Sequence, residues 1–477
     1  MSIDRGTLSE GSKRFIRGFT YVLGSNLTGL LANSVLIFGL PFVLTTEEYG
    51  YWQLYQFFSL YLGYVTFGIT DGVLLRYAGS LRRDLRAGSI SSQFWILGLL
   101  VTPMLGLIAY ISSQFETDSV NEVLLWAAAL GSMLFIPRTL VTSSAQAANE
   151  LSRFAMLNSI DRVLACVFTV GLIALGVREL YWLVLADLGA KLIALAVSVV
   201  VERSLVFSRW PSFKGVVSET CANVRAGSMV LVANLSVILV PGVARFVVEQ
   251  YWSIEEFGMV SLAFNVSNML LVVVMSLSIT VFPALRRLDR RRYPTLFEAA
   301  RSVITPVLFA ILLLFYVVAA AVDWLIPDYG PAVLFLSILF PAFVYEARLR
   351  VLASNFLKAI RRERTLMWIN IASVAAIVPL SWLGASVFHS IELTLATVLL
   401  VTAIRCAVSE AVLTRIIGGR WLSWAVIDAS MVCVFLVTTI WLPLPLGMLG
   451  YGLVCAGYWL GVHRRFADGA AALRSAM

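Results

Sequence analysis

Charged side chains inside long apolar stretches are the residues of this chain that could do chemistry. Each is costly to place in a bilayer, by at least about 2.5–3.5 kcal/mol, so those retained are expected to face protein or a water-filled cavity. Cations there suit phosphate oxygens, and acids there could take up a proton or sodium ion. The basic candidates are Arg138, Arg162, Lys191, Arg348, Arg350 and Arg405, and the acidic candidates are Asp161, Asp187, Glu346 and Asp428.

Two pairs of these residues have opposite charges at helical spacing. Asp187 precedes Lys191 by four residues, and Glu346 precedes Arg350 by four, so each pair would share one helix face. Each pair is therefore either a neutralised structural bridge or part of a transport pathway. The spacing alone leaves both readings open.

Three arginines are the best candidates for contact with a cargo. Arg138 follows Pro137, a predicted kink, and its stretch contains no acid beyond Glu122 at the outer end. Arg348 is two positions from Glu346 and therefore lies on nearly the opposite helix face. Arg405 is placed near the middle of the membrane. All the basic candidates together would form a sparse ladder that draws an anionic cargo through a wet cavity.

Asparagines in the first apolar stretch add a polar face. Asn26 and Asn33 are seven residues apart, which is about two helical turns. They either hydrogen-bond to neighbouring helices, which is the commoner case, or line the cavity and contact hydroxyl groups of a cargo.

The elements that must position these residues are membrane-spanning helices. Hydrophobic residues make up 60% of the chain and charged residues 13%, whereas soluble chains are about one quarter charged. The apolar residues form continuous blocks of about twenty, the length that crosses roughly 30 Å of hydrocarbon as a helix. We therefore expect an all-α polytopic membrane protein with 14 transmembrane helices. The predicted spans are 18–40, 53–74, 93–112, 122–143, 155–176, 181–201, 226–248, 259–283, 299–321, 332–357, 366–387, 393–413, 422–442 and 447–462.

The basic residues predict the orientation of these helices. Of the 36 Lys and Arg residues, 27 lie in the eight segments on one side, and Arg178 alone lies in the loops on the other. Because basic residues stay on the cytoplasmic side, both termini are expected in the cytoplasm and the chain in the plasma (inner) membrane. The net charge of +8 is thus a topology signal, and no nucleic-acid partner is expected.

An internal repeat divides the chain. At an offset of 208 residues, 18–50 aligns with 226–258 with ten identities, among them Asn26 with Asn234 and Glu48 with Glu256, and the basic pair Arg82–Arg83 maps onto Arg290–Arg291. Six spans lie between equivalent points, which predicts two parallel six-helix lobes. The expected parts are a cytoplasmic N-terminus at 1–17, an N-lobe at 18–203, a cytoplasmic linker at 204–225, a C-lobe at 226–414, two extra helices at 415–462 and a cytoplasmic C-terminus at 463–477.

The ordered motifs resemble those of the polysaccharide and O-antigen flippases in the multidrug and oligosaccharidyl-lipid exporter superfamily. The residues that carry this resemblance are Glu48-Tyr49-Gly50-Tyr51, Phe67-Gly68-Ile69, Asp71-Gly72, Arg76-Tyr77, Ile326-Pro327-Asp328-Tyr329-Gly330 and Lys358-Ala359-Ile360-Arg361-Arg362. The resemblance covers essentially the whole chain. It implies two lobes that form a V, as in multidrug exporters of this superfamily, and open alternately to each side of the membrane.

The resemblance implies a flippase for polysaccharide biosynthesis. Its cargo would be a polyprenyl-pyrophosphate-linked oligosaccharide moved from the cytoplasmic to the outer leaflet, with proton or sodium coupling and a glycan polymerase or ligase as candidate partners. The alternatives are an ion-coupled multidrug exporter and a non-transporting scaffold of a glycan assembly complex. No phosphate-binding loop, metal-ligand spacing or disulfide pattern is present, so we expect neither an enzyme nor a cofactor.

Overall fold

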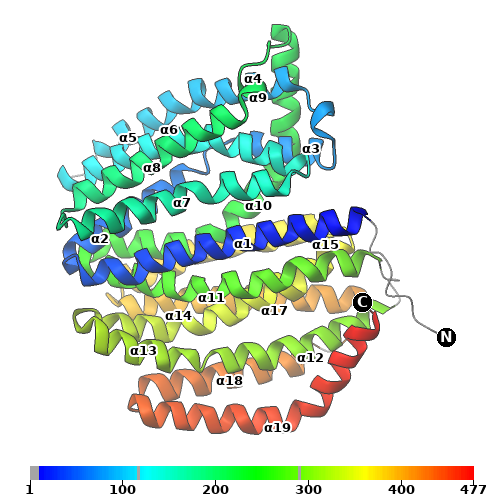
Figure 1. Cartoon of the computed structure of the whole chain (residues 1–477). Coiled ribbons are helices and arrows are strands. Elements are labelled where there is room, and N and C mark those ends of the chain that lie inside the picture. Colours follow the sequence, from blue (N-terminus) through cyan, green and yellow to red (C-terminus); the bar gives the residue numbers. More distant parts are fainter. Residues whose placement is uncertain (1–9, 115–118, 288–291, 420, 477) are drawn as a thin grey trace. The chain divides into compact units, whose positions relative to one another are not determined.

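Helices make up the regular secondary structure of the protein (Figure 1). The structure, a computed structural model, describes residues 10–114, 119–287, 292–419 and 421–476, and no strand occurs among them. These helices form two compact units, residues 1–234 and 235–477, which divide within helix α10. The predicted all-α polytopic fold is confirmed. Arg290 and Arg291 of the sequence repeat lie outside the described residues.

Among its described residues, the first unit contains nine helices and the first part of α10. The longest members correspond to predicted spans, whereas α3 and α9 are short. Their bounds are α1 Glu10–Gly39, α2 Thr46–Leu62, α3 Ile69–Tyr77, α4 Ala87–Ile96, α5 Thr102–Ser113, α6 Ser119–Ala147, α7 Leu151–Ala174, α8 Leu180–Val201, α9 Arg203–Val206 and α10 Phe213–Tyr251. Short 3-10 turns occupy Leu40–Phe42 and Arg82–Asp84, and a π-helical turn, Leu97–Val101, joins α4 to α5.

The second unit contains the rest of α10 and the helices that follow it. Their bounds are α11 Ile254–Arg287, α12 Tyr293–Ile311, α13 Leu314–Leu325, α14 Pro331–Arg348, α15 Asn355–Ala359, α16 Glu363–Ser386, α17 Ile391–Ile417, α18 Leu422–Ile440 and α19 Leu444–Ala476. A 3-10 turn, Pro327–Tyr329, precedes α14, and a π-helical turn, Leu349–Ser354, joins α14 to α15.

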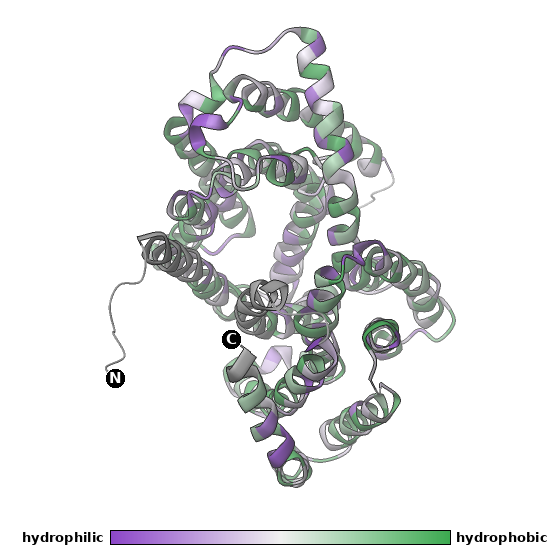
Figure 2. Cartoon of the chain, turned by 90° about the vertical axis from the view of Figure 1, so that its right-hand side faces the viewer, coloured by the Kyte–Doolittle hydropathy of each residue, from purple (hydrophilic) through white to green (hydrophobic). Residues whose placement is uncertain are grey.

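Hydrophobic residues predominate along these helices (Figure 2). Among the described residues, eleven helical segments are long and apolar enough to cross a membrane. The other three predicted spans, 53–74, 259–283 and 422–442, coincide with α2 and α3, with α11 and with α18. The number of fourteen crossings remains a prediction.

Two helix starts explain part of the sequence repeat. Thr45 caps α2, because its hydroxyl accepts from the Glu48 amide at 3.2 Å and the Glu48 carboxylate accepts from the Thr45 amide at 3.1 Å. Ser253 and Glu256 make the same reciprocal contacts before α11, at 3.3 and 3.1 Å. These capping boxes lie 208 residues apart, so the repeated glutamates fix equivalent helix starts.

The predicted span 53–74 is interrupted. Helix α2 ends at Leu62 and α3 begins at Ile69, and in between Phe67 and Gly68 have φ angles of 51° and 77°. A left-handed conformation at two consecutive residues breaks the helical path. Hydropathy averages over such a break and therefore does not reveal it.

Close packing joins α3 to the first part of α10. A Cβ atom at Gly72 would lie 2.0 Å from the Asn223 carbonyl oxygen, and one at Gly227 would lie 2.0 Å from the Gly68 carbonyl oxygen. Only glycine permits this approach. Since α9 extends to Val206 and α10 begins at Phe213, 16 of the 22 residues of the predicted linker 204–225 are helical.

Candidate functional site

The charged residues predicted in the membrane are nearly all paired. In the first unit, Arg138 on α6 forms an ion pair with Asp161 on α7 at 2.8 Å and donates to the Leu157 carbonyl at 3.0 Å. Both charged side chains are largely buried. Arg138 therefore has an acidic partner, but that partner comes from a neighbouring helix rather than from its own.

A second group in the first unit links α8 to α2. Lys191 forms an ion pair with Asp187 at 2.7 Å, as the four-residue spacing predicts. The Tyr55 hydroxyl donates to the same carboxylate at 2.6 Å and accepts from the Lys191 ammonium at 3.2 Å. The acid and the base thus satisfy each other within the unit.

Four buried charges in the second unit form one cluster. Arg348 at the end of α14 binds Glu410 on α17 through two nitrogens, at 2.6 and 2.7 Å, and also pairs with Asp428 on α18. Arg301 on α12 pairs with Glu410 at 2.7 Å and lies 4.0 Å from Asp428. Two positive and two negative groups give this four-helix cluster no net charge.

Beside it, Glu346 on α14 pairs with two arginines. The first is Arg350, four residues later, at 2.5 Å, and the second is Arg405 on α17. Arg405 is buried, and Arg350 is about one-third exposed. The predicted pair Glu346–Arg350 is thus present, and a third charge joins it.

Arg162 is the exception among the six predicted pathway cations. It lies twelve residues into the 24-residue α7, its side chain is exposed, and it forms no ion pair with any described residue. Its guanidinium lies over Gly29 of α1, because a Cβ atom there would be 3.0 Å from Nη1. Asn26 and Asn33 are three residues before and four after Gly29, so they flank Arg162 on one face of α1.

Two members of the buried cluster were not among the site residues predicted from the sequence. Arg301 lies close to the start of the predicted span 299–321, whereas α12 begins earlier, at Tyr293, and Arg301 is completely buried. Glu410 lies in the predicted span 393–413. Both residues could have been found in the sequence, because each is a charged residue inside an apolar stretch. Their partners lie on other helices and can be identified only from the packing of those helices.

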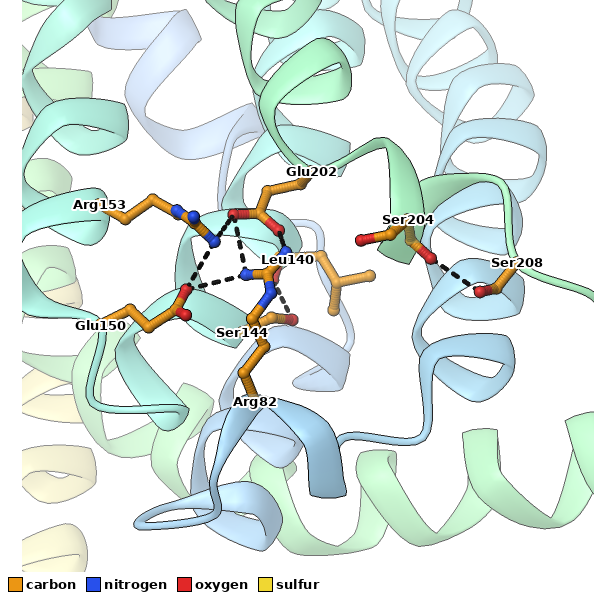
Figure 3. A network of polar contacts seen from close by, with 8 residues as sticks. All are labelled: Arg82, Leu140, Ser144, Glu150, Arg153, Glu202, Ser204 and Ser208. Carbon is orange, nitrogen blue, oxygen red and sulfur yellow. Dashed lines mark hydrogen bonds and ion pairs between the residues drawn. The ribbon is translucent and has the colours of Figure 1, made fainter.

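A further network joins three connections at one end of the first unit (Figure 3). Arg82 pairs with Glu150 at 2.8 Å and Glu202 at 2.5 Å, and Arg153 pairs with the same acids at 2.9 and 3.3 Å. The hydrogen bond that Arg82 donates to the Glu202 carboxylate raises the pKa of Arg82. The connections that follow α3, α6 and α8 therefore meet on one side of the unit.

A neighbouring contact fastens α3 to α10. Arg76 donates to the Glu219 carboxylate at 2.8 Å and to the Asn223 side-chain oxygen at 2.5 Å, and the Tyr77 hydroxyl donates to Glu219 at 2.9 Å. Burial, and then the bond to Glu219, raises the pKa of Tyr77 to about 12. This contact stabilises the glycine-mediated packing of the two helices.

No metal site is evident in the part of the chain that the structure describes. No group of three or more His, Cys, Asp or Glu side chains is arranged there to hold a metal ion. The five cysteines are all free thiols.

Comparison with known proteins identifies the fold. No protein-family model and no curated protein matches the sequence. Among solved structures, the lipid II flippase MurJ in an inward closed conformation is similar, with a TM-score of 0.67 and 11% identity over 94% of this chain and 99% of MurJ.

Multidrug transporters are also similar. A multidrug resistance MATE family transporter of the MOP superfamily matches in its outward-facing conformation, with a TM-score of 0.59 and 12% identity over 84% of this chain and 95% of that one. An inward-facing conformation gives a TM-score of 0.58 and 15% identity over 84% and 98% of the two chains. This chain therefore has the polytopic fold of MOP-superfamily membrane transporters.

Proposed function

We propose that this protein is a flippase that moves a polyprenyl-pyrophosphate-linked oligosaccharide from the cytoplasmic to the outer leaflet by alternating access, for polysaccharide biosynthesis. The observation that carries this proposal is the extent of the likeness to the lipid II flippase. That match leaves 6% of the 477 residues uncovered, about 29, which is fewer than α18 and α19 contain. It must therefore include part of this helix pair, whereas the MATE matches leave 16% uncovered, about 76 residues.

Arg162 supports an anionic cargo. An exposed arginine halfway along a membrane-spanning helix is too costly to face lipid, so it is expected to face water or a ligand. Its planar guanidinium suits the oxygens of a pyrophosphate. The flanking Asn26 and Asn33 add amide groups that can bind sugar hydroxyls.

The remaining pathway candidates have a different place in this proposal. Arg138, Arg348, Arg405, Lys191 and Arg350 would reach the cargo only after leaving a carboxylate, so Arg162 is the first contact.

An ion-coupled drug exporter is the main alternative. It needs a carboxylate that can take up the ion, but the four candidates already pair with basic side chains. A non-transporting scaffold of a glycan assembly complex needs no exposed cation at the position of Arg162. The flippase proposal includes the predicted orientation, with both termini in the cytoplasm of a cell with an inner membrane, and allows a glycan polymerase or ligase as partner.

Reconstitution tests the proposal. The purified protein is placed in vesicles with a fluorescent polyprenyl-pyrophosphate oligosaccharide, and a reductant that cannot cross the membrane reports how much of it lies in the outer leaflet. We expect the protein to accelerate exchange between leaflets, and Arg162→Gln to slow it by roughly tenfold, since a charge-assisted bond contributes about 1.5–3 kcal/mol.

A control variant and a second transport measurement distinguish the flippase proposal from its alternatives. Arg178→Gln removes an exposed cation from a predicted outer loop and should leave the rate unchanged. Exchange no faster than in empty vesicles, combined with gradient-driven transport of a cationic dye, would replace the proposal with drug export. Neither activity would favour the scaffold.

A further inference from the structure

A segment that runs from α9 into the start of α10 exposes three aromatic side chains. In residues 203–214, here called the basic-aromatic segment, Phe207, Trp210 and Phe213 have exposed fractions of 64%, 50% and 82%. Large apolar side chains grouped in this way mark a surface that contacts a partner or a membrane. The segment begins two residues after α8 ends at Val201, so it lies at the depth where a membrane-spanning helix leaves the bilayer.

The same segment carries positive charges that form no ion pair with any described residue. Arg203, Arg209 and Lys214 are exposed and alternate with the aromatic residues. The nearest acids along the chain, Glu202 and Glu219, are buried and pair with Arg82 and Arg76 from other elements. The exposed surface of the segment is therefore basic and aromatic, without an exposed acid.

Helix α4 holds the segment in place. Ser91 donates to the Val206 carbonyl at 2.6 Å and accepts from the Trp210 indole at 3.1 Å, and Trp95 donates to Val206 at 3.1 Å. A Cβ atom at Gly88 would lie 2.2 Å from the Arg209 carbonyl oxygen, so the backbone of the segment rests directly on α4. The aromatic and basic side chains are thus presented from a fixed backbone.

We propose that the basic-aromatic segment is a binding site for the headgroups of anionic phospholipids at the membrane surface where α8 ends. Aromatic rings favour the boundary between headgroups and hydrocarbon, and Arg and Lys extend their charges into the headgroup layer. Near an anionic surface each basic residue contributes about 1 kcal/mol, which corresponds to about a fivefold local enrichment of anionic lipid. This site is independent of the proposed flippase cargo.

Quenching of Trp210 fluorescence by brominated lipids tests the site directly. The protein is placed in phosphatidylcholine vesicles in which about a fifth of the lipid is dibrominated phosphatidylglycerol or, in parallel, dibrominated phosphatidylcholine. The signal of Trp210 is the difference between the unaltered protein and Trp210→Phe. We expect the anionic quencher to act on it at least about twofold more strongly than the neutral one.

Two matched triple variants decide what causes that preference. The preference should disappear in the triple variant Arg203→Gln/Arg209→Gln/Lys214→Gln. For each triple variant, the Trp210 signal is again the difference from the same variant that also carries Trp210→Phe. The preference should persist in a control variant that removes three exposed cations from a stretch without aromatic residues. The control substitutions are Arg361→Gln, Arg362→Gln and Arg364→Gln.

Each remaining outcome overturns the proposal. Equal quenching by both lipids would make the segment an uncharged interfacial anchor. No quenching of Trp210 by either lipid would place it away from the membrane and point to a protein partner. If the segment variant and the control variant lose the preference for the anionic lipid equally, the overall charge of the protein causes that preference. Because the vesicles contain no polyprenyl pyrophosphate, the cargo cannot produce the effect, and failure of this test leaves the flippase proposal intact.

Discussion

At the scale of single residues, the contact between Arg162 and Gly29 offers a way to move a cation without removing it. Gly29→Ala would place a Cβ atom 3.0 Å from the guanidinium, whose flexible side chain must then shift. Alanine is also the better helix former by about 0.8–1 kcal/mol. We therefore expect unchanged or higher thermal stability together with slower cargo exchange, measured by the leaflet assay.

Gly24→Ala is the control for that substitution. It lies in the same helix, and no atom lies within 4 Å of the added Cβ. It should gain similar helix stability without loss of transport. If both alanine variants exchange cargo as fast as the unaltered protein, the position of Arg162 is irrelevant to transport.

The buried cluster predicts a large cost for losing one acid. Glu410→Gln leaves Arg301 and Arg348 with Asp428 as the one remaining acid of the four-charge cluster. Removing one partner of a buried ion pair costs about 3–5 kcal/mol, because the remaining charge stays desolvated. The melting temperature in detergent should fall by many degrees. Glu363→Gln, at an exposed acid that begins α16, should leave it unchanged.

A neutral double variant separates charge from shape in that experiment. Arg348→Met/Glu410→Gln removes one charge of each sign and leaves Arg301 beside Asp428. If imbalance of charge causes the loss, the double variant should be more stable than Glu410→Gln alone. A further loss of stability would show that the hydrogen bonds, rather than the balance of charge, stabilise the cluster.

Local spacing explains which pairs the sequence could reveal. Asp187–Lys191 and Glu346–Arg350 were predictable, because residues four apart on a helix are neighbours whatever surrounds them. The partner of Arg138 was not, since Asp161 reaches it only when α6 packs against α7. Sequence reasoning therefore found the charges but could not assign the partners between helices.

At the scale of elements, the packing of α3 on α10 depends on glycine. Gly72→Ala places a Cβ atom against backbone rather than against a movable side chain, so the helices must separate. Separation would also lengthen the contacts from Arg76 to Glu219 and Asn223. We expect faster amide hydrogen exchange in α3 and a lower melting temperature.

Gly106→Ala in α5 is the matched control, because its added Cβ meets no atom within 4 Å. Unchanged exchange in α3 of the Gly72 variant would mean that the two helices are not held together in solution.

The same elements show where sequence patterns are informative. The repeated Glu48 and Glu256 pointed to equivalent segments, and their capping boxes give the physical reason. Hydropathy does not predict the break between α2 and α3, because apolar residues continue through it, while left-handed backbone angles at Phe67 and Gly68 separate the two helices. Average hydropathy detects a crossing and cannot detect a change of backbone direction within it.

At the scale of the whole molecule, the last two helices lie outside the sequence repeat but inside the second unit. Tyr316 and Thr438 share a hydrogen bond at 2.8 Å, and Tyr451 donates to the Phe309 carbonyl at 3.1 Å. Asp428 supplies one of the two acids in the buried cluster. Hydropathy predicts α18 and α19 but cannot show that Asp428 on α18 completes the charge balance of the buried cluster.

This dependence predicts that the C-terminal pair is required for a stable second unit. A chain that ends after Ile417 loses Asp428, so Arg301 and Arg348 share only Glu410, and the apolar surfaces of α12 and α13 lose their cover. We expect this chain to aggregate on size-exclusion chromatography in detergent, and residues 418–477 expressed as a separate chain to restore a monodisperse peak. If the truncated protein instead elutes as a single species with an unchanged melting temperature, α18 and α19 are not required for the stability of the second unit. Asp428→Asn should fall between these limits, because it removes one charge and keeps both helices.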